Sequence, residues 1–375
     1  MTTRLLAVGE PAPWFVARCT SNPTFHFDTI AGRYVVLCFF GSAAAPAARR
    51  VLDDILEARS AFDDANACFF GVSTDPEDER LARVQELLPG IRFFWDSDLA
   101  VSRLYGAVAE EPAAGPAVYR THTLLLDIRL RVVAALPFDE ASAGAHVPQL
   151  LERLARLPPI GPPAVAAVQA PVLVVPRVFE PEFCRLLIGY YDEHGGGESG
   201  FMREVDGKTV PVHDYGHKRR RDQEIADERL RKACMVRVHD RLAPEIHKAF
   251  QFRATRIERY IVACYDAATG GHFRPHRDNT TKGTAHRRFA VTLNLNTGQY
   301  EGGDLRFPEF GPHTYRAPLG GAVVFSCSLL HEATPVTRGR RYAFLPFLYD
   351  DAAARIREEN LRFLADNAPP PPPAT

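Results

Sequence analysis

Three residues in the C-terminal half have the side chains and the spacing that a metal centre requires. His276 and Asp278 are separated by one residue, and His331 follows much later, at the end of the apolar stretch AVVFSCSLL. In an extended segment, residues i and i+2 point to the same side, so His276 and Asp278 can offer an imidazole and a carboxylate to one ion. Two histidines and one carboxylate on a single face leave positions open for a chelating co-substrate and dioxygen, which is typical of non-haem Fe(II) sites.

The sequence blocks around these residues carry a wider pattern. In chain order, the blocks are RYIVACYDAATGGHFRPHRDN, RRFAVTLNLN, EGGDLRFP and LLHEATPVTRGRRY. Over about residues 172–350 they resemble the prolyl 4-hydroxylase-like branch of the 2-oxoglutarate/Fe(II) dioxygenases, whose core is a double-stranded β-helix. The resemblance implies that His276, Asp278 and His331 are the metal ligands. It further implies Fe(II), 2-oxoglutarate as co-substrate, O2, release of succinate and CO2, and L-ascorbate as the reductant.

The resemblance also marks residues for the co-substrate. Ten residues beyond His331 lies Arg341, where the family places a basic residue that binds the far carboxylate of 2-oxoglutarate. A planar guanidinium can hold a carboxylate by two parallel hydrogen bonds, although a solvated arginine of a basic turn is the alternative. Tyr265 is the hydroxyl expected to orient the co-substrate, or else a tyrosine packed in the barrel. Some family members carry another aromatic hydroxyl where this chain has Leu293, and Thr292 or Asn294 would have to replace it.

The N-terminal half resembles a different family. Its blocks VGEPAPWF, FDTIAGRYVVLCFFGSAAAP, GVSTD, WDSD and TLLLD are similar to the peroxiredoxin branch of the thioredoxin-like fold, over about residues 5–155. That family places a reactive cysteine on the first turn of a helix, where the helix dipole stabilises the thiolate. Its threonine and cysteine fall on Ala45 and Ala48 here, so we expect a degenerate, non-catalytic domain. The alternative is rescue by Cys19 or by Cys38, which stands in the middle of an expected strand.

Apolar periodicity separates two kinds of domain. Before residue 157, short apolar runs predict strands, and helical spacing predicts helices between them; the strands are at 34–41, 67–74, 92–96 and 121–127, and the helices at 49–62 and 81–88. This alternation predicts an α/β sheet. A proline-rich stretch at 157–171 predicts a linker. Helical segments at 181–194 and 227–250 follow, and then short strands, which predict an α+β domain with a jelly-roll core.

The domain boundaries follow from these patterns. We expect a thioredoxin-like, peroxiredoxin-type domain at 1–156, the linker at 157–171 and the dioxygenase domain at 172–352. Residues 353–375 are expected to form a C-terminal helix and an extended proline-rich tail.

Composition excludes several classes of protein. The 375 residues carry a formal net charge of -1, so no overall field would hold the chain on nucleic acid. No apolar run is long enough for a membrane span and the start has no apolar signal core, so a cytoplasmic protein is expected. The seven cysteines are scattered and contain no CxxC pair, which argues against a disulfide scaffold and a structural zinc site.

One basic run has two interpretations. Residues 217–224, HKRRRDQE, are expected either to be solvated or to form a mobile lid that steers an anionic substrate over the iron.

The leading hypothesis is therefore an Fe(II)/2-oxoglutarate hydroxylase acting on an unidentified protein or small-molecule substrate, with a prolyl residue as the default that the resemblance implies. The peroxiredoxin-like domain is expected to mediate homodimerisation or partner binding. The alternatives are a non-catalytic redox- or oxygen-responsive binding protein and, ranked last, a thiol peroxidase.

Overall fold

The computed structural model describes residues 4–108, 118–162, 164–165 and 168–364, and it divides into two compact units, residues 1–164 and 165–375. The division falls inside the proline-rich stretch. The expected proline-rich tail lies outside the described residues. Among the helices of the described part, none has the length and the apolar content to cross a membrane.

The N-terminal unit is built around a mixed sheet with the strand order β5-β4-β3-β6-β7. The strands are β3 (Tyr34–Gly41), β4 (Ala67–Ser73), β5 (Ile91–Trp95), β6 (His122–Leu126) and β7 (Val132–Pro137), besides the short pair β1 (Val16–Ala17) and β2 (Phe25–His26). The helices are α1 (Pro46–Glu57), α2 (Pro76–Arg80), α3 (Ala100–Leu104) and α4 (Ala143–Ala155), with 3-10 turns at Phe27–Ile30 and Arg59–Ala61. β3, β4 and β5 run parallel, whereas β6 and β7 are antiparallel to their neighbours. The α/β prediction is confirmed.

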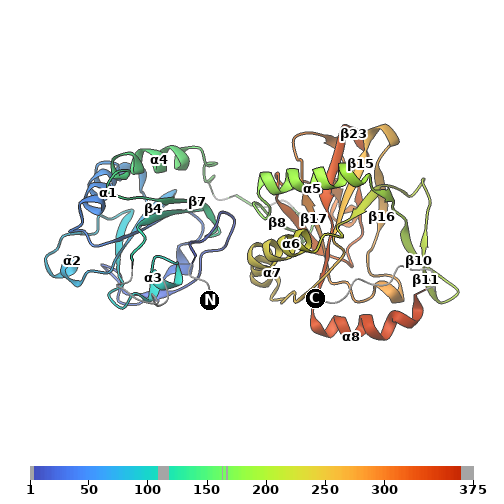
Figure 1. The fold of residues 1–375 in the computed structure, drawn as a ribbon, viewed down its shortest axis with the longest axis horizontal. Helices are drawn as coiled ribbons and strands as arrows, with labels where there is room; N and C mark the ends of the chain where they lie inside the picture. Colours follow the sequence, from blue (N-terminus) through green and yellow to red (C-terminus); the bar gives the residue numbers. More distant parts are fainter. Residues whose placement is uncertain (1–3, 109–117, 163, 166–167, 365–375) are drawn as a thin grey trace. The chain divides into compact units, whose positions relative to one another are not determined.

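Side-chain alternation on the central strand creates two cores. Val36 and Cys38 of β3 pack on the side of α1 and α4, whereas Val35 and Leu37 pack on the other side, with α3. Figure 1 shows α1 and α4 together on one face of this sheet. Because both faces are covered, the strands are continuous apolar runs, and the sequence revealed them for that reason.

The helix expected at 81–88 is absent. Helix α2 ends at Arg80, and Leu87 forms an antiparallel bridge with Ile91 instead. Leu81 and Leu88, which the helical spacing assigned to a buried face, are about half exposed, at 50% and 51%. Pro89 disfavours helical backbone at the residue before it, and this local restriction prevailed over the apolar spacing.

The C-terminal unit contains a larger sheet with the order β14-β25-β17-β24-β15-β13-β9, in which β21 also pairs with β17 and with β8. Its strands are β8 (Leu173–Val175), β9 (Gly197–Glu198), β13 (Arg221–Glu224), β14 (Arg256–Glu258), β15 (Ile261–Asp266), β17 (Phe289–Asn294), β21 (Ala322–Ser326), β24 (Arg340–Phe344) and β25 (Phe347–Tyr349).

A smaller sheet has the order β12-β16-β22-β19-β20. Its strands are β12 (Lys218–Arg219), β16 (His272–His276), β19 (Leu305–Arg306), β20 (Thr314–Tyr315) and β22 (His331–Ala333). Two separate pairs complete the strands, β10 (Phe201–Val205) with β11 (Lys208–Val212) and β18 (Glu301–Gly302) with β23 (Val336–Arg338). From β15 to β24 the chain passes repeatedly between the two sheets.

Helices cover the outer face of the larger sheet. They are α5 (Pro181–His194), α6 (Glu228–Arg241) and α7 (Ala243–Phe250). A further helix, α8 (Asp351–Asn360), follows the last strand and is not part of this layer. Short 3-10 turns are found at Ala267–Thr269, Lys282–Thr284, Pro308–Phe310 and Leu361–Phe363. Apolar residues of α5, α6 and α7 share one core with Val262, Leu293 and Phe344 of the sheet. The helical segment at 227–250 is broken at Leu242, because Pro244 starts a new helix and cannot continue the old one.

Candidate metal and co-substrate site

Strand pairing brings the three candidate metal ligands together. His276 is the last residue of β16 and His331 the first of β22, and the two are direct partners in the antiparallel register. Asp278 lies two residues beyond the end of β16. Its Oδ1 is 3.6 Å from Nε2 of His276, and its Oδ2 is 3.3 Å from Nε2 of His331. The candidate ligand atoms all lie within 4.8 Å of one another, which suits a single ion.

Backbone carbonyls orient both imidazoles. Nδ1 of His276 is 2.7 Å from the carbonyl oxygen of Arg274, and Nδ1 of His331 is 3.0 Å from that of Leu329. A carbonyl can only accept, so each Nδ1 donates to it, and each Nε2 faces Asp278, where it can bind a metal.

The charge state of the cluster also fits a metal. Burial lowers the pKa of His331 to about 4, so this imidazole is neutral at pH 7. Burial by itself raises the pKa of the Asp278 carboxyl, but His331, His276 and Arg287 outweigh it and hold that pKa well below its usual range. A carboxylate and neutral imidazoles are the forms that bind a divalent first-row metal.

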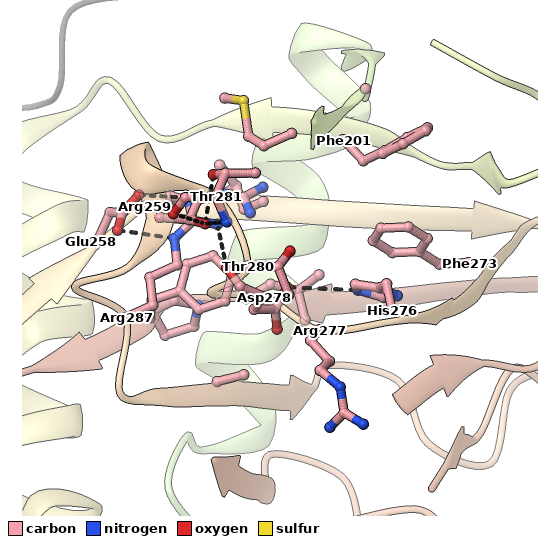
Figure 2. Close-up of a pocket in the computed structure, with 18 of the residues that line it drawn as sticks. Phe201, Glu258, Arg259, Phe273, His276, Arg277, Asp278, Thr280, Thr281 and Arg287 are labelled. Carbon is pink, nitrogen blue, oxygen red and sulfur yellow. Dashed lines mark hydrogen bonds and ion pairs between the residues drawn. The ribbon is translucent and has the colours of Figure 1, made fainter. Parts of the chain in front are cut away.

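Aromatic rings shield the cluster on two sides. The ring of Phe273 stacks on His276 with centroids 3.5 Å apart, and Phe325 meets His331 at 4.6 Å with its ring tilted by 60°. Figure 2 shows the ring of Phe273 beside His276, while the side chain of Arg277 extends in another direction. These rings limit water at the ligands.

Arg341 is buried inside the same cavity. Only 2% of the residue is exposed, and its direct register partner across β15 and β24 is Tyr265. Its Nη2 donates to Oδ1 of Asn294 at 3.4 Å, whereas its Nε has no hydrogen-bond partner among the described residues. In the same part of the chain it forms no ion pair with a carboxylate. Arg341 is therefore not a solvated arginine, and an incoming carboxylate would meet an unsatisfied donor.

Tyr265 lies between two guanidinium groups. The Arg341 guanidinium is 5.1 Å from the ring centroid of Tyr265, that of Arg220 is 5.7 Å away, and Nη1 of Arg220 donates to the tyrosine hydroxyl at 3.4 Å. The ring also packs in a small core with Phe273. Tyr265 therefore lies beside Arg341, where its hydroxyl could help to orient a ligand of that residue, and its ring also packs in the core of the domain.

The position of Leu293 in β17 bears on the aromatic hydroxyl that some family members carry there. This side chain packs in the helix-covered core, on the face of the sheet opposite to the cavity. Its neighbours alternate, so Thr292 lines the cavity and Asn294 contacts Arg341. No side chain at position 293 could have supplied the missing hydroxyl, because the pleat points it away.

The basic run at 217–224 is neither a solvated loop nor a separate lid. It forms β12 at the edge of the smaller sheet and β13 within the larger one. Lys218 and Arg220 are buried at 5% and 9% exposure, whereas Arg219 and Arg221, which alternate with them, are exposed. Residues 218–221 are all basic, so no alternation of charge in the sequence marked the buried positions; only their burial alternates.

A cavity of about 640 Å³ joins these groups. Its lining includes the three candidate ligands, Tyr265 and Arg341 and the further cations Lys218, Arg220, Arg259 and Arg287.

Comparisons with known proteins agree with this division. Residues 260–349 match the family model of the 2OG-Fe(II) oxygenase superfamily, and residues 8–132 match that of the AhpC/TSA family. The two halves of the chain therefore resemble two different families, and they are named here, by that resemblance, the peroxiredoxin-like domain and the prolyl 4-hydroxylase-like domain. A PKHD-type hydroxylase of Nitrosomonas europaea is 31% identical over 110 residues, which are 27% of this chain and 48% of that protein. One from Cupriavidus metallidurans is 37% identical over 95 residues, which are 23% of this chain and 42% of that protein. The chain thus spans about half the length of these relatives.

Two solved structures are also similar to parts of the chain. A Pseudomonas putida prolyl-4-hydroxylase is 20% identical, with a TM-score of 0.38, over 48% of this chain and 94% of that one. A Xanthomonas campestris peroxiredoxin Q mutant is 20% identical, with a TM-score of 0.31, over 38% of this chain and 92% of that one.

Among the described residues of the peroxiredoxin-like domain, no exposed sulfur lies near the expected nucleophile position. Ala48 on the first turn of α1 is 1% exposed, and all seven cysteines of the chain are buried and free. Burial raises the pKa of the Cys38 thiol to about 12. Cys38 is therefore a poor replacement for the missing cysteine.

Proposed function

We propose that the prolyl 4-hydroxylase-like domain, residues 172–352, is an Fe(II)- and 2-oxoglutarate-dependent dioxygenase that hydroxylates its substrate. The observation that carries the proposal is the convergence of His276, Asp278 and His331 on one point beside the buried, unpaired Arg341. A metal-binding cluster and an anion-binding group in one cavity are what a chelating dicarboxylate co-substrate requires.

The strand order supports a double-stranded β-helix core for this domain. The larger sheet contains the neighbours β15-β24-β17-β21, and the smaller sheet contains β16-β22-β19-β20. Successive strands alternate between the sheets, except that β19 and β20 form a hairpin. In the proposed jelly-roll arrangement, His276 and His331 belong to strands of the smaller sheet and Arg341 to a strand of the larger one.

The side chains divide the work of binding. Nε2 of each histidine and the carboxylate of Asp278 would hold Fe(II), and Arg341 would bind the far carboxylate of 2-oxoglutarate with Tyr265 beside it. Bound together, the metal and the co-substrate supply the activation of O2, with succinate and CO2 as products. The carbonyls of Arg274 and Leu329 keep the imidazoles in the required tautomer. Phe273 and Phe325 exclude water from the ligands.

The remaining parts of the proposal concern partners. L-ascorbate would re-reduce oxidised iron, and the substrate is an unidentified protein or small molecule; a prolyl residue is only the default that the resemblance implies. The peroxiredoxin-like domain is assigned to homodimerisation, and the cytoplasm is the proposed location.

The test measures succinate formed from 2-oxoglutarate by the full chain with Fe(II), O2 and ascorbate. His276→Ala should reduce turnover by about 100-fold or more, because a metal ligand is lost. Arg341→Ala should raise the KM for 2-oxoglutarate by about 10- to 100-fold, because a charged hydrogen-bonding partner is lost. The matched controls are His239→Ala and Arg338→Ala, at side chains that are 80% and 75% exposed, and they should behave like the wild type.

Absence of metal-dependent 2-oxoglutarate binding would refute the proposal and favour a non-catalytic binding protein. Binding that His239→Ala weakens as strongly as His276→Ala would also refute the assigned site.

A further inference from the structure

Lys218 is a buried cation close to the candidate metal site. It pairs directly with Phe273 in the register between β12 and β16, and its Nζ is 4.8 Å from the centroid of the Phe273 ring. That ring in turn stacks on His276. The ammonium group is therefore separated from a candidate metal ligand by a single aromatic ring.

Besides the Phe273 ring, two neutral oxygens contact this ammonium group. Nζ donates to Oγ of Ser199 at 2.7 Å and to the carbonyl oxygen of Gly200 at 2.6 Å. An ammonium group has three donors, and for the third no acceptor is found in the described part of the chain. No carboxylate forms an ion pair with Lys218 there either, although only 5% of the residue is exposed. Buried lysines are rarely left in this state.

The neighbouring carboxylate is already shared by two other cations. Asp222 accepts from Nε of Arg220 at 2.7 Å and from Nη2 of Arg220 at 2.6 Å, and Nη2 of Arg259 approaches it at 3.3 Å. Positive charge is therefore in excess around Asp222. Burial, followed by repulsion from Arg220, lowers the pKa of Lys218 well below its usual range, and the same two causes lower the pKa of Arg259 to about 10.

Glu258, a second carboxylate of this region, does not neutralise the excess positive charge around Asp222, because it has partners of its own. Glu258 accepts from Nη2 of Arg287 at 2.8 Å and pairs with Nε2 of His286 at 2.7 Å. Figure 2 shows Glu258 facing Arg287 within this group. Lys218, Arg259 and Arg287 all line the 640 Å³ cavity of the candidate site, so the excess positive charge lies in the wall of that cavity.

The rim of the cavity favours a small ligand. The hairpin formed by β10 and β11 is tied down at Thr209, whose Oγ1 accepts from the backbone N–H of Gly283 at 3.0 Å and whose backbone bridges to Leu364. Lys208 of the same hairpin donates to the carbonyl of Arg362 at 2.8 Å. Phe201 and Thr209 of this hairpin line the cavity. A volume of this size holds a dicarboxylate and one further small molecule.

We propose that the substrate of this domain is a small organic acid whose carboxylate or phosphate group binds to Lys218, with Arg259 beside it, while Arg341 holds the co-substrate. This inference rests on the proposed function. Lys218 and Arg341, both buried and without a carboxylate partner among the described residues, are thereby assigned to two different anions. The chemistry of an ammonium group suits carboxylates and phosphate monoesters alike, so the test includes both.

The experiment uses the full chain loaded with Mn(II) in place of Fe(II) and with 2-oxoglutarate, under nitrogen. Binding is measured by calorimetry for a panel of three- to six-carbon carboxylic acids, aromatic acids and phosphate monoesters, each paired with its neutral amide or alcohol. The wild type should bind at least one acid at least about tenfold more tightly than its neutral counterpart, as one charged hydrogen bond implies. Preference within the panel separates carboxylate from phosphate.

Variants at one position then test the assignment. Lys218→Met should weaken binding of that acid by about tenfold or more, Lys218→Arg should retain it, and Lys232→Met, at an exposed lysine of α6, should leave it unchanged. If Lys218→Met does not fold, Lys218→Gln, which keeps a donor for Ser199 and Gly200, carries the same expectation.

Three outcomes overturn the inference. They are a panel in which no acid is preferred over its neutral partner, acid binding that Lys218→Met leaves intact, and a loss of 2-oxoglutarate binding in Lys218→Met as large as in Arg341→Ala. The last outcome would place Lys218 in the co-substrate site. Absence of 2-oxoglutarate binding to the wild type refutes the proposed function instead, so the two failures are distinguishable.

Discussion

The two domains differ in how some of their buried charged groups are satisfied. In the peroxiredoxin-like domain, Asp78 accepts hydrogen bonds from the backbone N–H of Ala43 at 2.8 Å and from Oγ of Ser73 at 2.7 Å. Asp96 likewise accepts from the N–H groups at the start of α3, at 2.9 and 2.7 Å. In the prolyl 4-hydroxylase-like domain, Lys218 and Arg341 are buried with no carboxylate partner in the described residues.

This difference distinguishes buried charges that stabilise the fold from buried charges that can bind a ligand. A buried carboxylate with several donors stabilises the loop that supplies them, and it needs no ligand. A buried cation without an anion costs stability, and a protein that keeps one gains something from the ligand that neutralises it. The peroxiredoxin-like domain therefore keeps its polar framework without a nucleophile, whereas the other domain keeps groups that only a ligand can satisfy.

The largest expected effect comes from removing the carboxylate of Asp222, which Arg220 and Arg259 share. Asp222→Asn leaves Arg220 and Arg259 without the carboxylate that they share, so it should destabilise the prolyl 4-hydroxylase-like domain by about 3 to 5 kcal/mol. Urea denaturation followed by circular dichroism measures this loss. Both tryptophans of the chain, Trp14 and Trp95, lie in the other domain, so the tryptophan-fluorescence transition should not move.

The matched control is an exposed ion pair of the peroxiredoxin-like domain. Glu79 pairs with Arg18, and both side chains are about half exposed, so Glu79→Gln should cost only about 0 to 1 kcal/mol. An Asp222→Asn loss as small as that of Glu79→Gln would contradict the contrast between the domains.

A smaller effect is expected from pH on the peroxiredoxin-like domain. Burial lowers the pKa of His146 to about 4, while its Nε2 is 2.8 Å from Oγ1 of Thr123. Because the folded-state pKa is below the unfolded value of about 6.5, the unfolded state binds more protons between these values. Stability is therefore complete above pH 6.5 and decreases as the pH falls towards 4, by about 3 kcal/mol at most from this group.

Urea denaturation followed by tryptophan fluorescence at several pH values measures this decrease. His146→Gln removes the titrating group, so its stability should fall less steeply than that of the wild type between pH 6.5 and 4. Equal slopes in the two proteins would show that His146 does not titrate differently in the folded state.

The smallest effect is expected for peroxide chemistry. With a pKa of about 12, Cys38 is a thiolate in roughly 1 molecule in 100,000 at pH 7. Hydrogen peroxide mixed with the protein and dithiothreitol should therefore disappear at the rate of the buffer alone. Faster consumption that Cys38→Ser abolishes would support the thiol peroxidase hypothesis and contradict the interpretation of the peroxiredoxin-like domain as non-catalytic.

Much of the fold was predictable because its strands are short, apolar and buried. The strand Tyr34–Gly41 was predicted with the bounds that the structure has. The helix at 81–88 was wrong because a bridge to β5 determined the local backbone there. The hairpin of β10 and β11 gave no apolar signal, because β10 is largely exposed and lies on the rim of the cavity.

The candidate site was predictable only in part. The motif around His276, Asp278 and His331 singled out these residues, and the structure brings their ligand atoms together. The basic run at 217–224 was interpreted as solvated or mobile, although Lys218 and Arg220 are buried. Charged residues are usually solvated, and only pairing with β15 and β16 showed which of them point inwards.

The sequence by itself determined the two domain types and the residues that could bind a metal, because motif spacing and apolar periodicity are local properties of the chain. Only the tertiary structure decided which charges have partners. Lys218 and Arg341 are separated in the sequence by most of the domain, yet both line one cavity, and Asp222 can serve only the cations that lie beside it. Charge compensation depends on distance and burial, and these exist only once the sheets have packed.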